Sequence, residues 1–261
     1  MTKALILAAG FGSRLMPLTA NAPKTMVEYK GKKLIEYEIQ ALQGAGINAQ
    51  NIAVVGGYKA KILREFLENR FNITRFFENK NYARTNMLHS LFCAREFLSE
   101  CKENAQDIII SYADIVYFSP CVKLLLDSRA KLAICVDMQW RKLWEARFDD
   151  ILSDAESLKM RESNGDFFIT ELGKKPQSLA DIEAQYMGLF KISWDFLDEV
   201  IALYDALDKN AIFDGQPYNN IYMTSFLQAL IDKYHNAKAV KINGGWCEID
   251  FKSDLKVEIV Q

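Results

Sequence analysis

Short apolar segments alternate with helix-patterned segments through the first part of the chain, and this alternation constrains the fold most. The apolar segments cover residues 3–7, 51–55, 73–77 and 107–110. Between them, apolar residues recur at helical spacing over residues 34–42, 62–67 and 88–98. Strands that alternate with helices form right-handed βαβ units, in which parallel strands share one sheet with helices on both faces. We therefore expect an α/β fold with a Rossmann-like, mostly parallel mixed sheet.

The second half of the chain follows a different pattern. Asn164-Gly165 is a strong signal for a tight turn, so residues 157–161 and 166–171 are expected to form an inserted antiparallel hairpin. Further strands are expected at residues 131–138, 183–192, 239–242 and 246–249, which complete the sheet, and helices at residues 194–207 and 218–234. Because no linker or internal repeat interrupts this pattern, we expect a single domain over residues 1–261.

Charge and cysteine content exclude several classes of protein. The chain has 32 lysines and arginines against 34 acids, which argues against a protein that binds nucleic acid through a pervasive positive field. Its five cysteines are scattered without a C-x-x-C pair, so neither a disulfide framework nor a zinc site is indicated. The apolar run at residues 4–9 is too short for a secretion signal or a membrane span. We expect a cytoplasmic protein with no nucleic-acid partner.

A glycine-rich loop follows the first apolar segment directly. Small residues and glycines at residues 8–13 let the backbone approach a phosphate closely, and successive N–H groups can then bind it. Arg14 and Lys24 add charged groups suited to phosphate oxygens. The loop is not a dinucleotide fingerprint, because Leu15 stands where a third glycine is required, and the chain has no Walker motif. An ordinary strand-to-helix turn is the alternative, but the full motif with Pro23-Lys24 favours a phosphate site.

Two aspartates follow predicted strands and are candidates for a metal site. Asp114 closes the segment at residues 107–110, and Asp250 follows residues 246–249. Either one alone could cap a helix or lie in solvent. However, Mg²⁺ prefers one or two carboxylates together with phosphate oxygens. Beside a phosphate-binding loop, we therefore expect Asp114 and Asp250 to hold Mg²⁺, for which Mn²⁺ can substitute.

Several motifs together resemble the sugar-1-phosphate nucleotidyltransferase family. They are the loop at residues 7–19 with Pro23-Lys24, Thr85-Asn86 with Ser90-Leu91, residues 111–116, Gly188-Leu189 and residues 244–250. More narrowly, the chain is similar to the phosphocholine cytidylyltransferases and to related enzymes acting on phosphonates. The resemblance implies Mg²⁺-dependent transfer of CMP from CTP to a small acceptor's phosphate, with release of pyrophosphate, for cell-surface polysaccharide decoration. The acceptor would be phosphocholine-like, phosphoglutamine or a phosphonate.

The resemblance also assigns roles to single residues. It implies a nucleotide-binding half over residues 1–130 and an acceptor-binding half over residues 131–261. The nucleotide-binding residues would be Ala8, Ala9, Gly10, Gly12, Ser13, Arg14 and Asn86. Lys24, Arg14 and Asp114 would be catalytic, with Lys24 bridging the α-phosphate and the acceptor phosphate. The acceptor-binding residues would be Trp140, Arg147, Lys174, Tyr186 and Glu248.

The acceptor and the reaction class both have alternatives. Trp140, Trp144 and Trp246 could form a cage for a quaternary ammonium, or the aromatic residues could simply pack in the core. Arg141 and Arg147 would instead suit an acidic acceptor. Similar sequences usually carry acids where this chain has Gln185 and Ser225. A hexose-1-phosphate uridylyl- or thymidylyltransferase is one alternative, and a non-catalytic nucleotide-binding regulator is another. Homo-oligomerisation also stays open.

Overall fold

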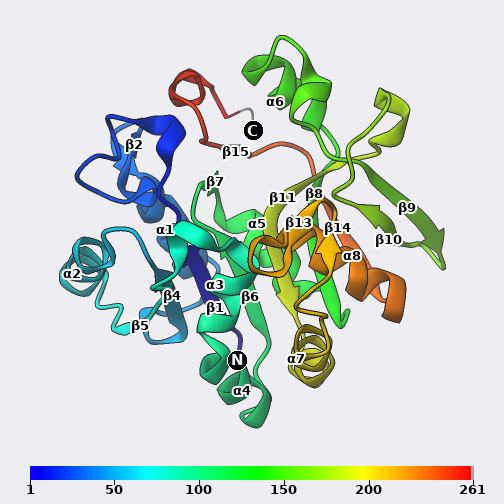
Figure 1. The fold of residues 1–261 in the computed structure, drawn as a ribbon, viewed down its shortest axis with the longest axis horizontal. Coiled ribbons are helices and arrows are strands. Elements are labelled where there is room, and N and C mark those ends of the chain that lie inside the picture. The colour runs from blue at the N-terminus through cyan, green and yellow to red at the C-terminus, as the bar shows by residue number, and fades with distance from the viewer. Residues whose placement is uncertain (260–261) are drawn as a thin grey trace.

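The structure, a computed structural model that describes residues 1–259, is built on a nine-stranded sheet (Figure 1). Its strands lie in the order β5 (Arg75–Glu78), β4 (Ile52–Gly56), β1 (Lys3–Ala8), β6 (Ile108–Tyr112), β11 (Gln185–Ile192), β8 (Leu132–Asp137), β14 (Ala237–Ile242), β10 (Asp166–Leu172) and β9 (Leu158–Ser163). Strands from both halves of the chain therefore belong to one sheet.

The sheet is parallel at one end and largely antiparallel at the other. β5, β4, β1 and β6 run parallel to one another, as the βαβ pattern predicts. β11 is antiparallel to both β6 and β8, β14 is parallel to β8, and the β9–β10 hairpin forms the far edge. At the hairpin turn, Asn164 and Gly165 have φ values of 53° and 82°, the left-handed conformation that such a tight turn requires. The predicted mixed sheet and inserted hairpin are confirmed.

Helices cover both faces of the sheet, as predicted. The first face carries α3 (Met87–Cys93), α4 (Arg95–Glu103), α7 (Leu197–Asp205) and α8 (Met223–Tyr234), and the second carries α1 (Leu34–Gly44), α2 (Ala60–Phe71), α5 (Ser119–Asp127) and α6 (Trp140–Arg147). Alternate side chains of β1 reach the two faces: Leu5 and Leu7 join the first core, and Ala4 and Ile6 the second. The helix expected over residues 88–98 is in fact two, since the chain turns at Ala94 between α3 and α4. Within the described residues, no helix is long and apolar enough to cross a membrane.

One predicted strand lies outside the main sheet, so that expectation is wrong. Gly244 and Gly245 both have positive φ values and turn the chain away from β14. The next segment, β15 (Trp246–Glu248), pairs antiparallel with β7 (Ile115–Tyr117), which directly follows Asp114. Two further small sheets are β2 (Glu28–Tyr29) with β3 (Lys32–Lys33) and β12 (Ile212–Phe213) with β13 (Gln216–Pro217). The β7–β15 pairing brings the 246–250 segment to the end of β6.

Candidate active site

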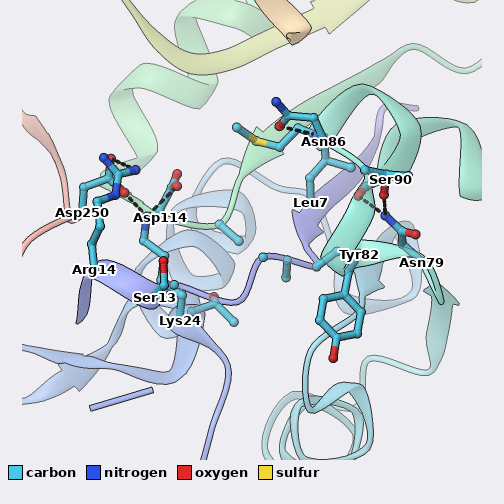
Figure 2. A pocket seen from close by; sticks show the side chains of 18 residues that line it. Leu7, Ser13, Arg14, Lys24, Asn79, Tyr82, Asn86, Ser90, Asp114 and Asp250 are labelled. Carbon is cyan, nitrogen blue, oxygen red and sulfur yellow. Dashed lines mark hydrogen bonds and ion pairs between the residues drawn. The ribbon is translucent and has the colours of Figure 1, made fainter. Parts of the chain in front are cut away.

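A cavity of about 230 Å³ lies where the parallel strands end, as expected for this type of sheet (Figure 2). All the residues predicted to bind the nucleotide line it: Ala8, Ala9, Gly10, Gly12, Ser13, Arg14 and Asn86. Lys24, Asp114 and Asp250 line it too. The charged side chains gather at one end of this cavity, and Asn79, Tyr82, Asn86 and Ser90 lie at the other.

The glycine-rich loop folds back over Lys24. Gly12 has φ 68° and ψ 43°, and a Cβ at this position would lie 2.7 Å from the Cβ of Lys24. The hydroxyl of Thr19 donates a hydrogen bond of 3.0 Å to the carbonyl of Gly12 and closes the turn. Around an ideal Cβ on Gly10, by contrast, no protein atom lies within 4 Å. The backbone is therefore tightly packed on its inner side and open toward the cavity.

Two cations and two carboxylates form a paired cluster at the charged end. Lys24 Nζ lies 2.8 Å from Asp114 Oδ2 and also donates to Asp250 Oδ1, and Arg14 Nη2 lies 2.8 Å from Asp250 Oδ2. Burial alone would lower the pKa of Lys24, but the charges of Asp114 and Asp250 raise it above its ordinary value. Burial opposes ionisation of Asp250, yet Lys24 and Arg14 lower its pKa. Lys24 and Asp250 therefore stabilise each other's charged forms.

Glu248 supplies a third carboxylate to this cluster. One oxygen each from Asp114, Glu248 and Asp250 lies within 4.8 Å of the others. Burial raises the pKa of Glu248 to about 8. The positive charge of Arg147 opposes this rise, and the negative charges of Asp250 and Asp114 add to it. The second oxygen of Asp114, Oδ1, is buried and has no hydrogen-bond partner in the part of the chain that the structure describes. Three convergent carboxylates, one with an unused buried oxygen, fit a hard divalent cation.

Arg147 positions the acidic segment that carries Glu248 and Asp250. It does not line the cavity itself. Its fully buried guanidinium lies 2.9 Å from Glu248 Oε2 and 3.3 Å from Asp254 Oδ1. Asp254 in turn accepts hydrogen bonds of 2.8 Å from the backbone N–H groups of Asp250 and Phe251. Arg147 was predicted to contact the acceptor; in the structure its guanidinium is paired with Glu248 and Asp254.

The uncharged end of the cavity is lined by polar side chains that are hydrogen-bonded to one another and to the backbone. The side-chain amide of Asn79 donates to Ser90 Oγ at 2.9 Å and to Thr85 Oγ1 at 3.0 Å. Asn86 caps α3 and donates to the carbonyl of Asn220 at 3.4 Å. Ser90 was noted in the sequence only as part of a family motif, without a role, and Asn79 was not identified. Asn79 directly follows β5, so the strand-end rule that found Asp114 could have found it as well.

A second cavity, of about 190 Å³, adjoins the first and shares Asn86 and Met87 with it. Of the residues predicted to bind the acceptor, Tyr186 and Glu248 line this cavity, whereas Trp140, Arg147 and Lys174 do not. Trp140 is buried in the core, and Lys174 is exposed and lies 3.1 Å from Glu171. Trp144, Asp154, Glu156 and Gln185 also line this cavity. Its walls come from segments far apart in the chain.

Known proteins resemble the chain over its whole length. The pattern of the nucleotidyl transferase family matches residues 3–249. The CTP:phosphoglutamine cytidylyltransferase of Campylobacter jejuni is 59% identical over 256 residues, which cover 98% of each chain. The choline-phosphate cytidylyltransferase of Streptococcus pneumoniae is 41% identical over 97 residues, 37% of this chain and 41% of that protein. The inositol-1-phosphate CTP transferase of T. maritima shares the fold, with a TM-score of 0.74 at 19% identity, covering 97% of this chain and 91% of that one. The chain therefore belongs to the nucleotidyl transferase family, in its cytidylyltransferase branch.

Proposed function

We propose that this enzyme transfers CMP from CTP to the phosphate of a small phosphorylated acceptor and releases pyrophosphate. The main support is the position of Lys24 and the three-carboxylate cluster, which lie where a phosphate-binding loop meets two adjoining cavities. Phosphoglutamine is the proposed acceptor, because the relative that is 59% identical carries it in its name.

The residues of the first cavity account for binding of the triphosphate. The loop amides and Arg14 bind its β- and γ-phosphates, and the cytosine lies among the polar groups of Asn79, Asn86 and Ser90. Lys24 then contacts the α-phosphate and the incoming acceptor phosphate. Because the reaction brings two anions together, these cations lower the barrier mainly by neutralising charge and by positioning.

We further propose that Asp114, Asp250 and Glu248 hold Mg²⁺, or Mn²⁺ in its place. A bound divalent cation supplies positive charge at the reacting phosphates. In the structure Lys24 contacts two of these carboxylates, Asp114 and Asp250. Because of these contacts, its ammonium stays close to the reacting groups when it turns toward a phosphate.

A matrix of substrates tests this function. CTP, UTP, GTP and ATP are each combined with phosphoglutamine, phosphocholine, 2-aminoethylphosphonate and glucose 1-phosphate, and pyrophosphate release is measured. We expect the highest kcat/KM for CTP with phosphoglutamine, with Lys24→Ala as the background control. Preference for UTP with glucose 1-phosphate would favour a sugar nucleotidyltransferase instead. CTP binding without turnover on any acceptor would identify a non-catalytic regulator.

The proposed product has a use that fits the acceptor class. A phosphate activated by CMP is a good donor for transfer onto a glycan, so we propose that the enzyme serves surface polysaccharide decoration from the cytoplasm. Deletion of its gene in the source organism should remove the corresponding phosphorylated substituent from the purified polysaccharide, as measured by ³¹P NMR. An unchanged spectrum would contradict this role.

A further inference from the structure

The second cavity is acidic and contains one carboxylate without a partner. Asp154, Glu156 and Glu248 line it, and no lysine or arginine within residues 1–259 does. Glu248 lies 2.9 Å from the guanidinium of Arg147, and Asp154 lies 4.0 Å from it. The carboxylate of Glu156 makes no hydrogen bond or ion pair with any other described residue. The wall of the cavity therefore carries a carboxyl group that has no counter-charge among the described residues.

Gln185 fixes the backbone of Glu156 in place. Gln185 is buried at the start of β11, and its side-chain amide donates to the carbonyl of Glu156. The N–H of Glu156 donates back to Gln185 Oε1 at 3.3 Å. The buried side-chain amide of Gln185 thus holds the backbone of Glu156 against the central sheet through both its oxygen and its nitrogen. Glu156 is a fixed part of the cavity wall.

The surroundings of Glu156 favour a cation. Burial raises its pKa to about 7, and the nearby charge of Asp154 adds to this effect. A half-buried carboxylate without a counter-charge is unfavourable, and an ammonium group at hydrogen-bond distance reduces that cost. Trp144 and Tyr186 also line the cavity, and the indole N–H of Trp144 and the hydroxyl of Tyr186 are buried without a hydrogen-bond partner among residues 1–259. They suit a ligand that brings oxygen atoms as well.

We propose that Glu156 binds an ammonium group at the far end of the acceptor and so selects phosphorylated amines and amino acids over neutral sugar phosphates. The proposal rests on the function given above, with the acceptor phosphate near Lys24 and the rest of the acceptor in the second cavity. Glu156 is then a specificity-determining residue, positioned by Gln185.

Matched acceptor pairs test this role. Phosphoglutamine is compared with its analogue that lacks the α-amino group, and 2-aminoethylphosphonate with ethylphosphonate, in the wild type, Glu156→Gln and Glu162→Gln. Glu162→Gln is the control, because it makes the same change on the exposed β9 strand outside both cavities. We expect Glu156→Gln to raise the KM for amino acceptors at least tenfold. The KM for CTP and the kinetics with the des-amino acceptors should stay within about twofold of wild type.

The outcomes separate this proposal from the proposed function. If the wild type is active on amino acceptors and Glu156→Gln leaves their KM unchanged, Glu156 does not bind the ammonium group. Equal losses on amino and des-amino acceptors would show a merely structural role and would also overturn the proposal. Absence of wild-type turnover on every acceptor would contradict the function itself. In that case, calorimetric titration of 2-aminoethylphosphonate into wild type and Glu156→Gln still measures whether Glu156 contributes to binding, and equal affinities would overturn its role.

Discussion

The two cavities differ in how their charged groups are compensated. In the first cavity, Lys24, Arg14, Asp114 and Asp250 neutralise one another before any ligand binds. In the second cavity, Glu156 has no partner among the described residues. A ligand of the first site must therefore exchange existing ion pairs for new ones, whereas a ligand of the second site supplies a missing charge. Removing a charged side chain from the first site should therefore also disturb the ion-pair partners that remain. Removing the carboxylate of Glu156 from the second site should affect only the binding of its ligand.

The largest effect is expected for Lys24→Ala. Loss of the cation between Asp114 and Asp250 removes charge stabilisation at the reacting phosphates, so kcat/KM should fall by about a thousandfold or more. The far-UV circular dichroism spectrum should stay unchanged. Lys32→Ala is the matched control, since Lys32 is exposed, donates to Gln40 at 2.9 Å and lies over the ring of Tyr37, outside both cavities. Turnover above half of the wild-type value would exclude this role for Lys24.

Asp114→Asn and Asp250→Asn should each lower turnover by about a hundredfold. If one ion serves both aspartates, the double variant will be little worse than either single variant. Titration of Mn²⁺ followed by electron paramagnetic resonance should show weaker binding in both, and Asp149→Asn, on the surface, should match wild type. EDTA should abolish wild-type activity and added Mg²⁺ restore it. Full activity in excess EDTA, or losses that multiply in the double variant, would contradict a shared metal.

Arg14→Lys should be nearly as damaging as Arg14→Ala. A planar guanidinium can bind a phosphate with two hydrogen bonds while it faces Asp250, which an ammonium cannot reproduce. We expect both variants to raise the KM for CTP by about tenfold. Arg141→Lys, which changes an exposed arginine paired with Glu145, should leave this KM unchanged. Wild-type CTP affinity in Arg14→Lys would show that only the net charge matters.

The smallest effect is expected for Glu38, and it concerns stability. Glu38 is enclosed in the core, whereas Glu156 lies in the wall of a cavity. Glu38 is fully buried on α1, where Oε2 accepts from Ser111 Oγ at 3.2 Å and Oε1 has no partner. Burial raises the pKa of Glu38 well above its ordinary value. Above a pH of about 4.5, the unfolded chain therefore releases this proton while the folded protein retains it, and stability falls as the pH rises.

Glu38→Gln should remove this pH dependence. We measure the free energy of unfolding of wild type and variant by urea denaturation. Relative to wild type, Glu38→Gln should be more stabilised, or less destabilised, at pH 8 than at pH 5. The KM for CTP should stay the same, because Glu38 lines neither cavity. A destabilisation that grows with pH would mean that Glu38 is ionised in the folded protein.

The sequence predicted the first cavity well because its parts are local. The loop at residues 8–14 is one continuous motif, and Asp114 follows a strand whose apolar pattern is plain. Residues that follow a parallel strand lie in the ligand crevice at the end of the sheet. This placement does not depend on contacts with distant parts of the chain. Asp250 was also predicted to lie there, although the strand before it pairs with β7 and not with the main sheet.

The second cavity was harder to predict because long-range contacts form it. Helical spacing left Trp140 and Trp144 open between core and site, and only the packing of α6 shows that Trp144 lines a cavity and Trp140 does not. Arg147 was predicted to bind the acceptor, yet its guanidinium forms ion pairs with Glu248 and Asp254, which lie far from it in the sequence. The unexpected amide at Gln185 has a clear structural role, since it holds Glu156. Nothing in the structure explains Ser225 on α8.

The pairing of β15 with β7 has a consequence for the order in which the protein matures during synthesis. A nascent chain that has released β14, which ends at Ile242, already contains every strand of the large sheet and the whole phosphate-binding loop. It contains neither Glu248 nor Asp250. At that stage Lys24 has one carboxylate partner in place of two, and the three-carboxylate cluster does not exist. The sheet can therefore form on the ribosome before the active site does, and the last strand to emerge completes it.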